Sequence, residues 1–307
     1  MSAQNTMWLI FGSVIAVMFV LDLWVFNRKS HEIKFREALT WTVAWVSLAM
    51  LFNLGVWYYM GPTKALEFFT GYIIEESLSV DNLFVFIMIF SYFNVPRALQ
   101  PKILKWGIIG ALIMRAIFIL LGIELIERFH WMVYIFGAIL IYTGFKMAFG
   151  GEEKIEPEKN PLVRLARRFI PITKRNVGDK FFIKRRGIWA ATPLFLTLIV
   201  VESSDLIFAV DSIPAVLAVT HDPFIVYSSN VFAIMGLRSL YYLLAHVMEM
   251  FAYLKLGVSC ILVFVGAKML LVDIVEIPLL LSLGVIIGTL TISILTSIFI
   301  AKKPHRI

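Results

Sequence analysis

The chain has 307 residues, of which 60% are hydrophobic and only 16% are charged, and its mean hydropathy is +0.86. Soluble domains contain about a quarter charged residues, so this composition excludes an ordinary soluble protein and indicates an integral membrane protein. The net charge of +7 does not indicate a nucleic-acid partner, because the basic residues fall in loops between apolar stretches. The single cysteine, Cys260, lies within an apolar stretch, so we expect a packing residue and neither a disulfide within the chain nor a thiolate metal cluster.

Nine apolar stretches are long enough, at about 20 residues each, to cross a bilayer as helices. They cover residues 7–26, 37–60, 65–93, 102–123, 131–149, 189–219, 224–248, 254–272 and 277–301. The residues before the first stretch carry no Lys or Arg, whereas Arg28 and Lys29 follow it, which is the reverse of a secretory signal peptide. We therefore expect the first stretch to remain as a membrane helix with its N-terminus outside.

The distribution of basic residues predicts the orientation of the chain. With the N-terminus outside, the segments on the cytoplasmic side contain 22 of the 28 Lys and Arg residues, and the loop 150–188 alone contains 11 of them. The loops on the opposite side contain only Lys64 and Arg128. This asymmetry follows the positive-inside rule and predicts a multi-pass protein with its C-terminus in the cytoplasm.

Two polar stretches interrupt the apolar spans. One begins at Glu75 and includes Asp81, and the other contains Glu202, Asp205 and Asp211 within ten residues. The first and second stretch share a pattern of Asp, any residue, an aliphatic residue and Phe. A carboxylate without a partner is costly at bilayer depth, so such residues usually face a partner, a cavity or an ion pathway. We interpret the two stretches as the halves of one polar site near the middle of the membrane.

The candidate ligands in these stretches are all oxygen donors, with neither His nor Cys among them. Hard divalent ions such as Mg²⁺, Ca²⁺ and Mn²⁺ suit carboxylate and amide oxygens, and the donor types alone do not choose among these ions. Carboxylates gathered in a low dielectric also repel one another, which favours exchange of protons for a cation. The predicted metal ligands are Glu75, Asp81, Asn82, Glu202, Asp205 and Asp211.

The alternative interpretation is a set of buried salt bridges that only hold helices together. Arg115, Arg238 and Lys268 fall within or at the ends of spans and could serve as counter-ions. Buried ion pairs stabilise proteins less well than apolar packing, and the acids outnumber these bases. We therefore favour a cation pathway, and we expect a structural counter-ion role for the basic residues.

Helical periodicity complicates a single site. At about 100° per residue, Glu202 and Asp205 share a helix face, whereas Asp211 lies nearly opposite Glu202. Either the helices are broken, or each half of the site contributes to two places. Pro214 removes the helical partner of the Val210 carbonyl, so we hypothesise a helix break that frees this carbonyl as a cation ligand beside Asp211.

The chain also contains an internal repeat. Three pairs recur at nearly constant offset: Asp81 with Asp205 (124 residues), Arg115 with Arg238 (123) and Gly144 with Gly266 (122). Each unit holds three spans and the loop between them does not cross the membrane, so the second unit enters from the opposite face. The predicted fold class is an all-α membrane protein of about nine transmembrane helices that contain an inverted repeat of three-helix units. The single polytopic domain, 1–307, then comprises repeat one at about 65–149, the cytoplasmic loop 150–188, repeat two at about 189–272, and extra helices at 7–60 and 277–301.

The loop 150–188 is the only sizeable segment predicted outside the membrane. Within residues 161–170, apolar residues are interleaved with Arg164, Arg167 and Arg168 at near-helical spacing. This stretch either lies on anionic lipids of the inner leaflet or is a solvated linker with a short helix. The loop has no zinc-ligand spacing, phosphate-binding loop or nucleophile elbow, and we predict that the protein is not an enzyme.

The two polar stretches resemble the paired signatures of TerC-family integral membrane proteins, most closely those of the Alx-type bacterial subgroup. The matching motifs are Glu75-x-Ser77-Leu78-Ser79-x-Asp81-Asn82 and Glu202-x-Ser204-Asp205-x-x-Phe208-Ala209-x-Asp211-Ser212-Ile213-Pro214-Ala215. The resemblance implies a bacterial inner-membrane protein related to the LysE-type exporter group, with efflux of Mn²⁺ and with tellurite resistance as the family label. It places the family's acids at Glu75, Asp81, Glu202, Asp205 and Asp211.

Residues and resemblance together predict a membrane transporter that exports Mn²⁺, or another divalent cation, in exchange for protons. Its partners are then the lipid bilayer, the transported ion and the coupling proton, with no prosthetic group and no nucleic acid. The rival hypothesis is a non-transporting membrane scaffold in a tellurite or metal-stress resistance complex, which acts through the cytoplasmic loop. The sequence does not define the oligomeric state.

Overall fold

The computed structural model is mostly helical and describes residues 3–20, 33–150, 161–173, 177–185, 188–247, 253–275 and 277–301. The helices are α1 (Ala3–Val20), α2 (Phe35–Met60), α3 (Pro62–Tyr92), α4 (Gln100–Arg128), α5 (Met132–Phe149), α6 (Pro161–Phe169), α7 (Pro193–Leu217), α8 (Pro223–Val247), α9 (Leu254–Leu270) and α10 (Leu279–Ala301). A short 3₁₀ helix, η2 (Arg97–Leu99), precedes α4. Two strands, β1 (Phe182–Arg185) and β2 (Ile188–Ala191), pair antiparallel with Phe182 opposite Ala191.

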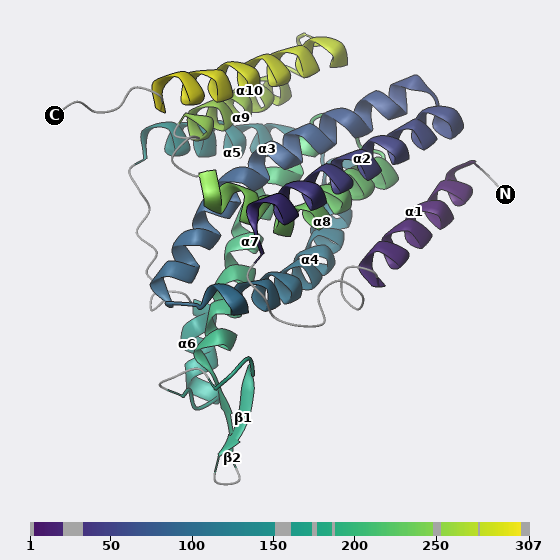
Figure 1. Cartoon of the computed structure of the whole chain (residues 1–307). Helices are drawn as coiled ribbons and strands as arrows, with labels where there is room; N and C mark the ends of the chain where they lie inside the picture. Colours follow the sequence, from purple (N-terminus) through teal and green to yellow (C-terminus); the bar gives the residue numbers. More distant parts are fainter. Residues whose placement is uncertain are drawn as a thin grey trace.

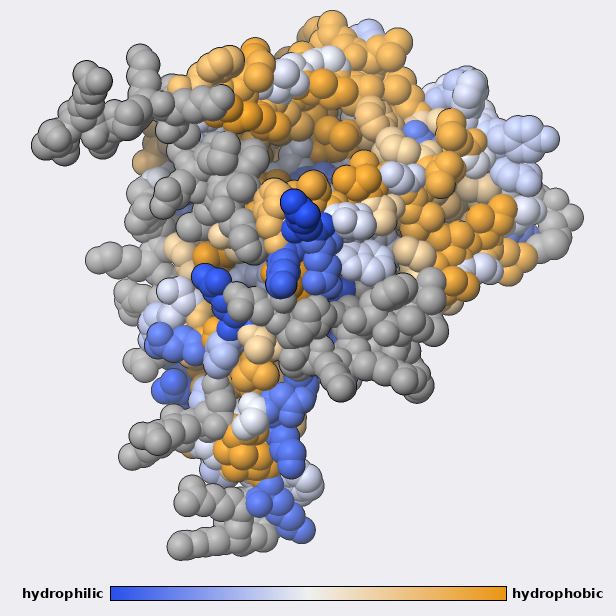
Figure 2. Space-filling view, in the orientation of Figure 1, coloured by the Kyte–Doolittle hydropathy of each residue, from blue (hydrophilic) through white to orange (hydrophobic). Residues whose placement is uncertain are grey.

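The long helices pack into one bundle, from which α6 and the β1–β2 hairpin project (Figure 1). Among the described residues, five helices are long and apolar enough to cross a membrane: Phe35–Met60, Arg97–Arg128, Met132–Phe149, Pro193–Leu217 and Leu279–Phe299. Apolar side chains cover most of the bundle surface seen in Figure 2, as expected for helices that face lipid. The predicted all-α membrane fold class is thereby confirmed.

Each predicted span overlaps a helix of the described chain, but the span predicted at 189–219 begins late. Residues 188–191 form β2 instead, so α7 starts at Pro193. The Thr192 hydroxyl donates to the Lys180 carbonyl at 2.8 Å, which holds the hairpin against the first turn of α7. The hairpin was not predicted, because Ile188 and Trp189 read equally well as the start of an apolar helix.

Proline and glycine define several helix boundaries. Pro62, Pro193 and Pro223 each lie in the first turn of a helix, where the missing amide hydrogen has no helical partner to lose. Gly61 separates α2 from α3 with φ of 91°, a value that glycine adopts without strain. Its N–H donates to the Trp57 carbonyl at 3.0 Å, so α2 ends and α3 begins without an extended loop.

The α7 helix runs without interruption from Pro193 to Leu217, with Pro214 inside it. The hypothesised helix break is therefore wrong. The Ala218 N–H donates to the Pro214 carbonyl at 2.9 Å, so helical hydrogen bonding continues directly after the proline. Asp205 and Asp211 lie on one regular helix and must point in different directions, which leaves the alternative of two separate polar places.

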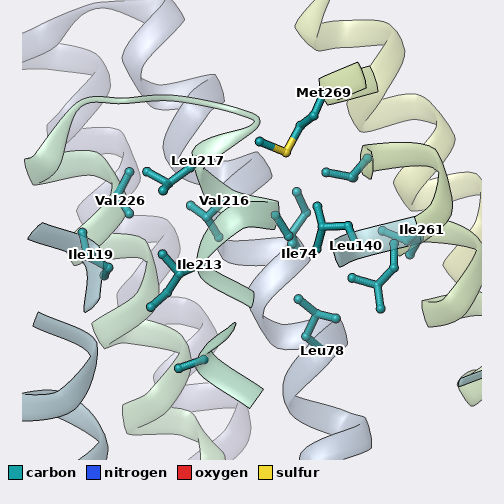
Figure 3. Close-up of a cluster of buried hydrophobic side chains, with 14 of the residues drawn as sticks. Ile74, Leu78, Ile119, Leu140, Ile213, Val216, Leu217, Val226, Ile261 and Met269 are labelled. Atoms are coloured by element: carbon teal, nitrogen blue, oxygen red, sulfur yellow. The ribbon is translucent and has the colours of Figure 1, made fainter. Parts of the chain in front are cut away.

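The α3, α4, α5, α7 and α9 helices contribute to one apolar cluster of the bundle. Figure 3 shows Ile74, Leu140 and Ile213 of this cluster, which come from α3, α5 and α7. The α5 and α9 backbones come very close, since a Cβ added to Gly266 would lie 2.7 Å from the Gly137 carbonyl oxygen. This seam requires glycine, because any side chain would force the two helices apart.

Candidate functional site

Arg115 of α4 lies at the centre of a polar cluster among α3, α4, α7 and α8, and its side chain is fully buried. Its Nη1 donates to Glu75 Oε1 on α3 and, at 2.7 Å, to Asn230 Oδ1 on α8. Its Nη2 lies 4.0 Å from Asp205 Oδ1 on α7, which is beyond hydrogen-bond distance. One guanidinium group therefore lies between acids from both polar stretches. We call Arg115, Glu75, Asn230 and Asp205 the arginine cluster.

A small cavity adjoins the arginine cluster. Its volume is about 20 Å³, room for roughly one water-sized particle, and Glu202, Asp205 and Arg238 line it together with apolar side chains. The Glu202 side chain extends toward α4, where a Cβ added to Gly110 would collide with both of its carboxylate oxygens. Gly110 thus leaves the space that the Glu202 carboxylate occupies.

Several polar atoms of the arginine cluster have no hydrogen-bond partner in the part of the chain that the structure describes. They are Glu75 Oε2, Asp205 Oδ2, and Nε and Nη2 of Arg115. Buried polar atoms are usually paired, so atoms of this kind mark places where a ligand or water can supply the missing partner. The two carboxylates each retain one oxygen with which to bind such a ligand.

Acids and bases lie close together near the arginine cluster. Glu76, next to Glu75, accepts a hydrogen bond from the Tyr72 hydroxyl at 2.8 Å and lies toward Gly236 of α8. Glu75 and Asp205 are buried, Glu76 and Glu202 are only partly buried, and the basic groups Arg115 and Arg238 are buried. The buried acids and bases of this region are therefore equal in number, and the carboxylates exceed the bases, four to two, only when the partly buried acids are counted.

The first polar stretch continues along one buried face of α3. Glu75 and Ser79 are fully buried, and Asn82 is 4% exposed. Neither Ser79 Oγ nor Asn82 Nδ2 has a hydrogen-bond partner within the described ranges. Asp81 also lies on α3, but its side chain is outside the described residues.

Asp211 belongs to a second polar place. It follows Asp205 by six residues, which is about 9 Å along a helix axis, and it accepts a hydrogen bond from the Thr143 hydroxyl of α5 at 2.8 Å. Asp211 is only partly buried, whereas Asp205 is 4% exposed. The structure therefore does not bring Asp211 together with Glu75 and Arg115.

Lys268 lies in a third place, where α3 and α8 begin. It lines a cavity of about 570 Å³ together with Lys64, Glu67 and Asp222. Lys64 Nζ lies 2.8 Å from Glu67 Oε2 and 3.3 Å from Asp222 Oδ2, and this ties the start of α3 to the turn between α7 and α8. Of the three predicted counter-ions, only Arg115 and Arg238 lie beside the buried acids.

Within the residues that the structure describes, no three His, Cys, Asp or Glu side chains converge closely enough to hold a metal ion. Glu75 and Asp205 approach the same guanidinium from opposite stretches instead. A cation that binds both carboxylates would have to take the position of part of the Arg115 side chain. Glu75 and Asp205 thus both lie beside the Arg115 guanidinium, and each has one carboxylate oxygen without a partner among the described residues.

Sequence reasoning missed Asn230. This residue is fully buried, accepts from Arg115 and donates from Nδ2 to the Val226 carbonyl at 3.0 Å. The consecutive polar residues Ser228, Ser229 and Asn230 within an apolar span are the signal that could have identified it.

The helical bundle with its buried acids and arginines defines a multi-pass integral membrane protein with a polar centre. The model of the family described as "Integral membrane protein TerC family" matches residues 60–305, and the chain belongs to this family. The resemblance predicted from the two acidic motifs is confirmed. No solved structure matches the chain.

Relatives of known name match nearly the whole chain. The chain is 51% identical over 299 residues to a Myxococcus xanthus protein described as an uncharacterized membrane protein, covering 97% of this chain and 93% of the relative. It is 47% identical over 309 residues to the Escherichia coli (strain K12) protein named "Putative membrane-bound redox modulator Alx", covering 98% of this chain and 96% of the relative. An uncharacterized membrane protein of Rickettsia bellii is 38% identical over 291 residues, with 95% and 96% of the two chains covered.

Proposed function

We propose that this protein is a transporter that exports Mn²⁺, or another divalent cation, in exchange for protons. The observation that carries the proposal is the group of four carboxylates near Arg115 and Arg238, of which the buried Glu75 and Asp205 each keep an oxygen without a partner among the described residues. Uncompensated charge inside a membrane is costly, so an excess of carboxylates over basic groups is retained where a cation or protons neutralise it. The donors on offer are oxygens, which suit hard divalent ions.

In this proposal Arg115 competes with the transported cation for the same acids. A cation that binds Glu75 and Asp205 displaces the guanidinium from Glu75, and Arg115 keeps Asn230 as an acceptor at 2.7 Å. When the cation leaves, Arg115 pairs with Glu75 again, and a proton neutralises a carboxylate that has no basic partner, which couples export to proton entry. Asn82 on the same face of α3 is a further ligand, and Glu202 beside the small cavity is a ligand or a proton carrier.

Asp81 and Asp211 have weaker structural support as ligands of the same ion. Asp211 contacts Thr143 at the second polar place. We propose that it binds the cation at another stage of its passage along α7, because the same helix carries Asp205 two turns earlier. Asp81 stays in the proposed ligand set on the strength of its motif.

We also propose that the helices form an inverted repeat, with α3–α5 as one unit and α7–α9 as the other. A two-fold relation makes each contact between the units occur twice with the partners exchanged. In the proposed repeat, α3 corresponds to α7 and α4 corresponds to α8. The packing of α3 on α8 therefore has its counterpart in the packing of α7 on α4. Gly144 lies against the Ser259 carbonyl and Gly266 against the Gly137 carbonyl. An offset of 122 residues takes position 144 to 266 and position 137 to 259. Exchanging the two units therefore turns the contact of Gly144 with Ser259 into the contact of Gly266 with Gly137.

The remaining topology is part of the same proposal. Nine membrane crossings place the N-terminus outside and the C-terminus in the cytoplasm of a bacterium, with the basic loop 150–188 on the cytoplasmic side. Export then means movement from that side to the side where Lys64, Glu67 and Lys268 line the larger cavity.

Mn²⁺ uptake into proteoliposomes with an acidic lumen tests the function, because protons leaving the lumen should drive Mn²⁺ inward. The wild type should accumulate Mn²⁺ only with the pH gradient, and Glu75→Gln should abolish this uptake. Glu124→Gln is the matched control on the exposed end of α4, where Glu124 pairs with Arg128. Correctly inserted wild-type protein that shows no gradient-dependent uptake contradicts the proposal.

The scaffold hypothesis predicts the opposite pattern in cells under manganese load. A scaffold is indifferent to Asp211→Ala and loses its protective effect when residues 160–175 are deleted. A transporter loses protection with Asp211→Ala while the protein still inserts. Total cell manganese, measured for both variants at equal expression, separates the two.

A further inference from the structure

We propose that α6 and the β1–β2 hairpin form a docking surface for anionic lipid headgroups of the membrane's own cytoplasmic leaflet. The surface consists of an exposed apolar strip on α6 (Leu162, Leu165 and Phe169), the arginines of the same helix (Arg164, Arg167 and Arg168), and the exposed hairpin face of Phe182, Lys184 and Trp189. It lies outside the arginine cluster and does not depend on the transported ion.

The α6 helix has three distinct faces. At about 100° per residue, Leu162, Leu165 and Phe169 lie within roughly 60° of one another. These side chains are 43%, 53% and 74% exposed, whereas Val163 on the neighbouring face is fully buried. The inward face is thus used for packing, and a second apolar strip is left on the outside. Large apolar side chains gathered on a surface usually mark a contact with a protein or with lipid.

The third face of α6 carries Arg164, Arg167 and Arg168, all of them exposed. The nine-residue helix has no Asp or Glu. At about 100° per residue the arginines lie on the side of α6 away from the strip, with Arg168 nearest to it. An apolar strip with basic residues on the polar side is typical of helices that lie in the plane of a membrane interface, with the strip among acyl chains and the cations reaching the phosphates. Arginine is well suited to this role because its guanidinium binds phosphate oxygens in pairs.

The hairpin presents the same combination. Lys184 pairs with Trp189 and Phe182 with Ala191, and residues in register point to the same face of a two-stranded sheet. Phe182, Lys184 and Trp189 are exposed on that face, Trp189 by 62%, whereas Ala191 on the same face is buried and the Phe182 ring also lies 4.4 Å from the Phe195 ring of α7. Tryptophan is enriched at membrane interfaces, where its ring contacts both acyl chains and headgroups.

The position of the surface favours lipid over an acidic protein partner. Val163 packs in the same buried cluster as Leu194, in the first turn of α7, so α6 lies at the level where α7 begins. Trp189 precedes the start of α7 by only four residues. If α7 crosses the membrane, both apolar patches therefore lie close to the membrane surface.

The hairpin is also fixed in place. Lys102 at the start of α4 contacts Asp179 Oδ2 at 2.9 Å and lies over the Phe181 ring at 5.1 Å. The Thr173 N–H donates to the Ala191 carbonyl at 2.9 Å and ties the segment after α6 to β2. Figure 2 shows apolar and strongly hydrophilic side chains next to one another over this projecting part of the molecule.

Site-directed fluorescence tests the proposal, and the single cysteine simplifies it. In a Cys260→Ser background, Leu165→Cys or Phe169→Cys is labelled with an environment-sensitive fluorophore in the full-length protein. Val177→Cys, in the turn before β1, is the matched control on an exposed apolar residue outside the surface. The protein is placed in nanodiscs of zwitterionic lipid alone or with phosphatidylglycerol, and quenching by spin-labelled lipids and by iodide is compared.

With phosphatidylglycerol present, labels at 165 and 169 should be quenched by shallow spin-labelled lipid and protected from iodide, and the label at 177 should show the reverse. Replacing Arg164, Arg167 and Arg168 by Gln should lower the ratio of lipid-inserted to water-exposed label by roughly fivefold for each arginine replaced. Equal iodide access at 165, 169 and 177 overturns the proposal and leaves the strip to a protein partner. Lipid quenching that is independent of both lipid charge and the arginines overturns the role of anionic headgroups.

Discussion

The arginine cluster and the Lys102–Asp179 pair use the same chemistry in opposite environments. Arg115 and Glu75 are completely buried, whereas the side chains of Lys102 and Asp179 are 28% and 55% exposed. An exposed pair is screened by water and contributes about 0–1 kcal/mol, while breaking a buried pair costs about 3–5 kcal/mol. The comparison shows that burial, more than the contact itself, determines how strongly the protein depends on an ion pair.

The two regions also differ in how completely their atoms are paired. Lys102 binds both the side chain and the main-chain carbonyl of Asp179. In the arginine cluster, one oxygen each of Glu75 and Asp205 has no partner among the residues that the structure describes. A cluster that served stability alone would gain from pairing these oxygens or from being apolar, so the unpaired oxygens favour a role in binding.

Removing Arg115 should have the largest effect. Arg115→Met leaves Glu75 and Asp205 buried without their cation, and we expect a loss of about 3–5 kcal/mol in the free energy of unfolding. Unfolding in mixed micelles measures this change. The double variant Arg115→Met with Glu75→Gln removes one of the stranded charges and should be more stable than the single variant. If Arg115→Met unfolds like the wild type, the stability of the fold does not depend on pairing these buried carboxylates with the guanidinium.

A change to the apolar seam of the same bundle separates the effect of charge from that of packing. Gly266→Ala places a Cβ 2.7 Å from the Gly137 carbonyl oxygen, so α5 and α9 must move apart. Overpacking of this kind costs about 1–3 kcal/mol, less than stranding a buried charge. Gly288→Ala is the matched control, because nothing lies within 4 Å of a Cβ added there. Thermal unfolding of both variants in detergent measures the difference, and equal stability would contradict the close backbone contact.

Much of this comparison could be predicted from the sequence. The apolar stretches predicted the helices because a bilayer requires long uninterrupted apolar segments. The excess of acids over bases inside those stretches predicted a polar site with a negative charge. The structure buries Arg115 beside Glu75 and Asp205, and the negative charge stays a prediction. Asp205 and Asp211 were predicted to point in different directions on a regular helix, and they contact Arg115 and Thr143 respectively.

Other features depend on contacts that a single sequence does not reveal. Asn230 is one amide among hydroxyl residues on α8, and only the folding of α8 against α4 brings it to Arg115. The break predicted at Pro214 did not form, since the loss of one hydrogen bond is tolerated where the surrounding residues, from Ile213 to Leu217, are fully packed. The β1–β2 hairpin was hidden because β2 continues directly into the apolar sequence of α7.

The second polar place should respond less strongly than the arginine cluster. Thr143→Val removes the hydroxyl that donates to Asp211 at 2.8 Å but keeps the shape of the side chain. The Thr143 hydroxyl supplies one hydrogen bond and no charge, so we expect a loss of about 1 kcal/mol, less than for a stranded buried charge. Unfolding of this variant, compared with Thr40→Val on the exposed face of α2, measures it. A loss as large as that of Arg115→Met would mean that Asp211 is as dependent on its partner as Glu75.

The smallest effect is expected at Lys102. Lys102→Ala removes an exposed pair and should cost less than about 1 kcal/mol at neutral pH. The Lys102 ammonium lowers the pKa of Asp179 by hydrogen bonding and by its charge. A lowered carboxyl pKa stabilises the fold above the usual pKa of aspartate, and this contribution is lost as the pH falls through the lowered value. The stability difference between wild type and Lys102→Ala should therefore be present at pH 7 and disappear below about pH 3. A difference that persists in acid would mean that Lys102 acts through its contact with the Phe181 ring rather than through the carboxylate.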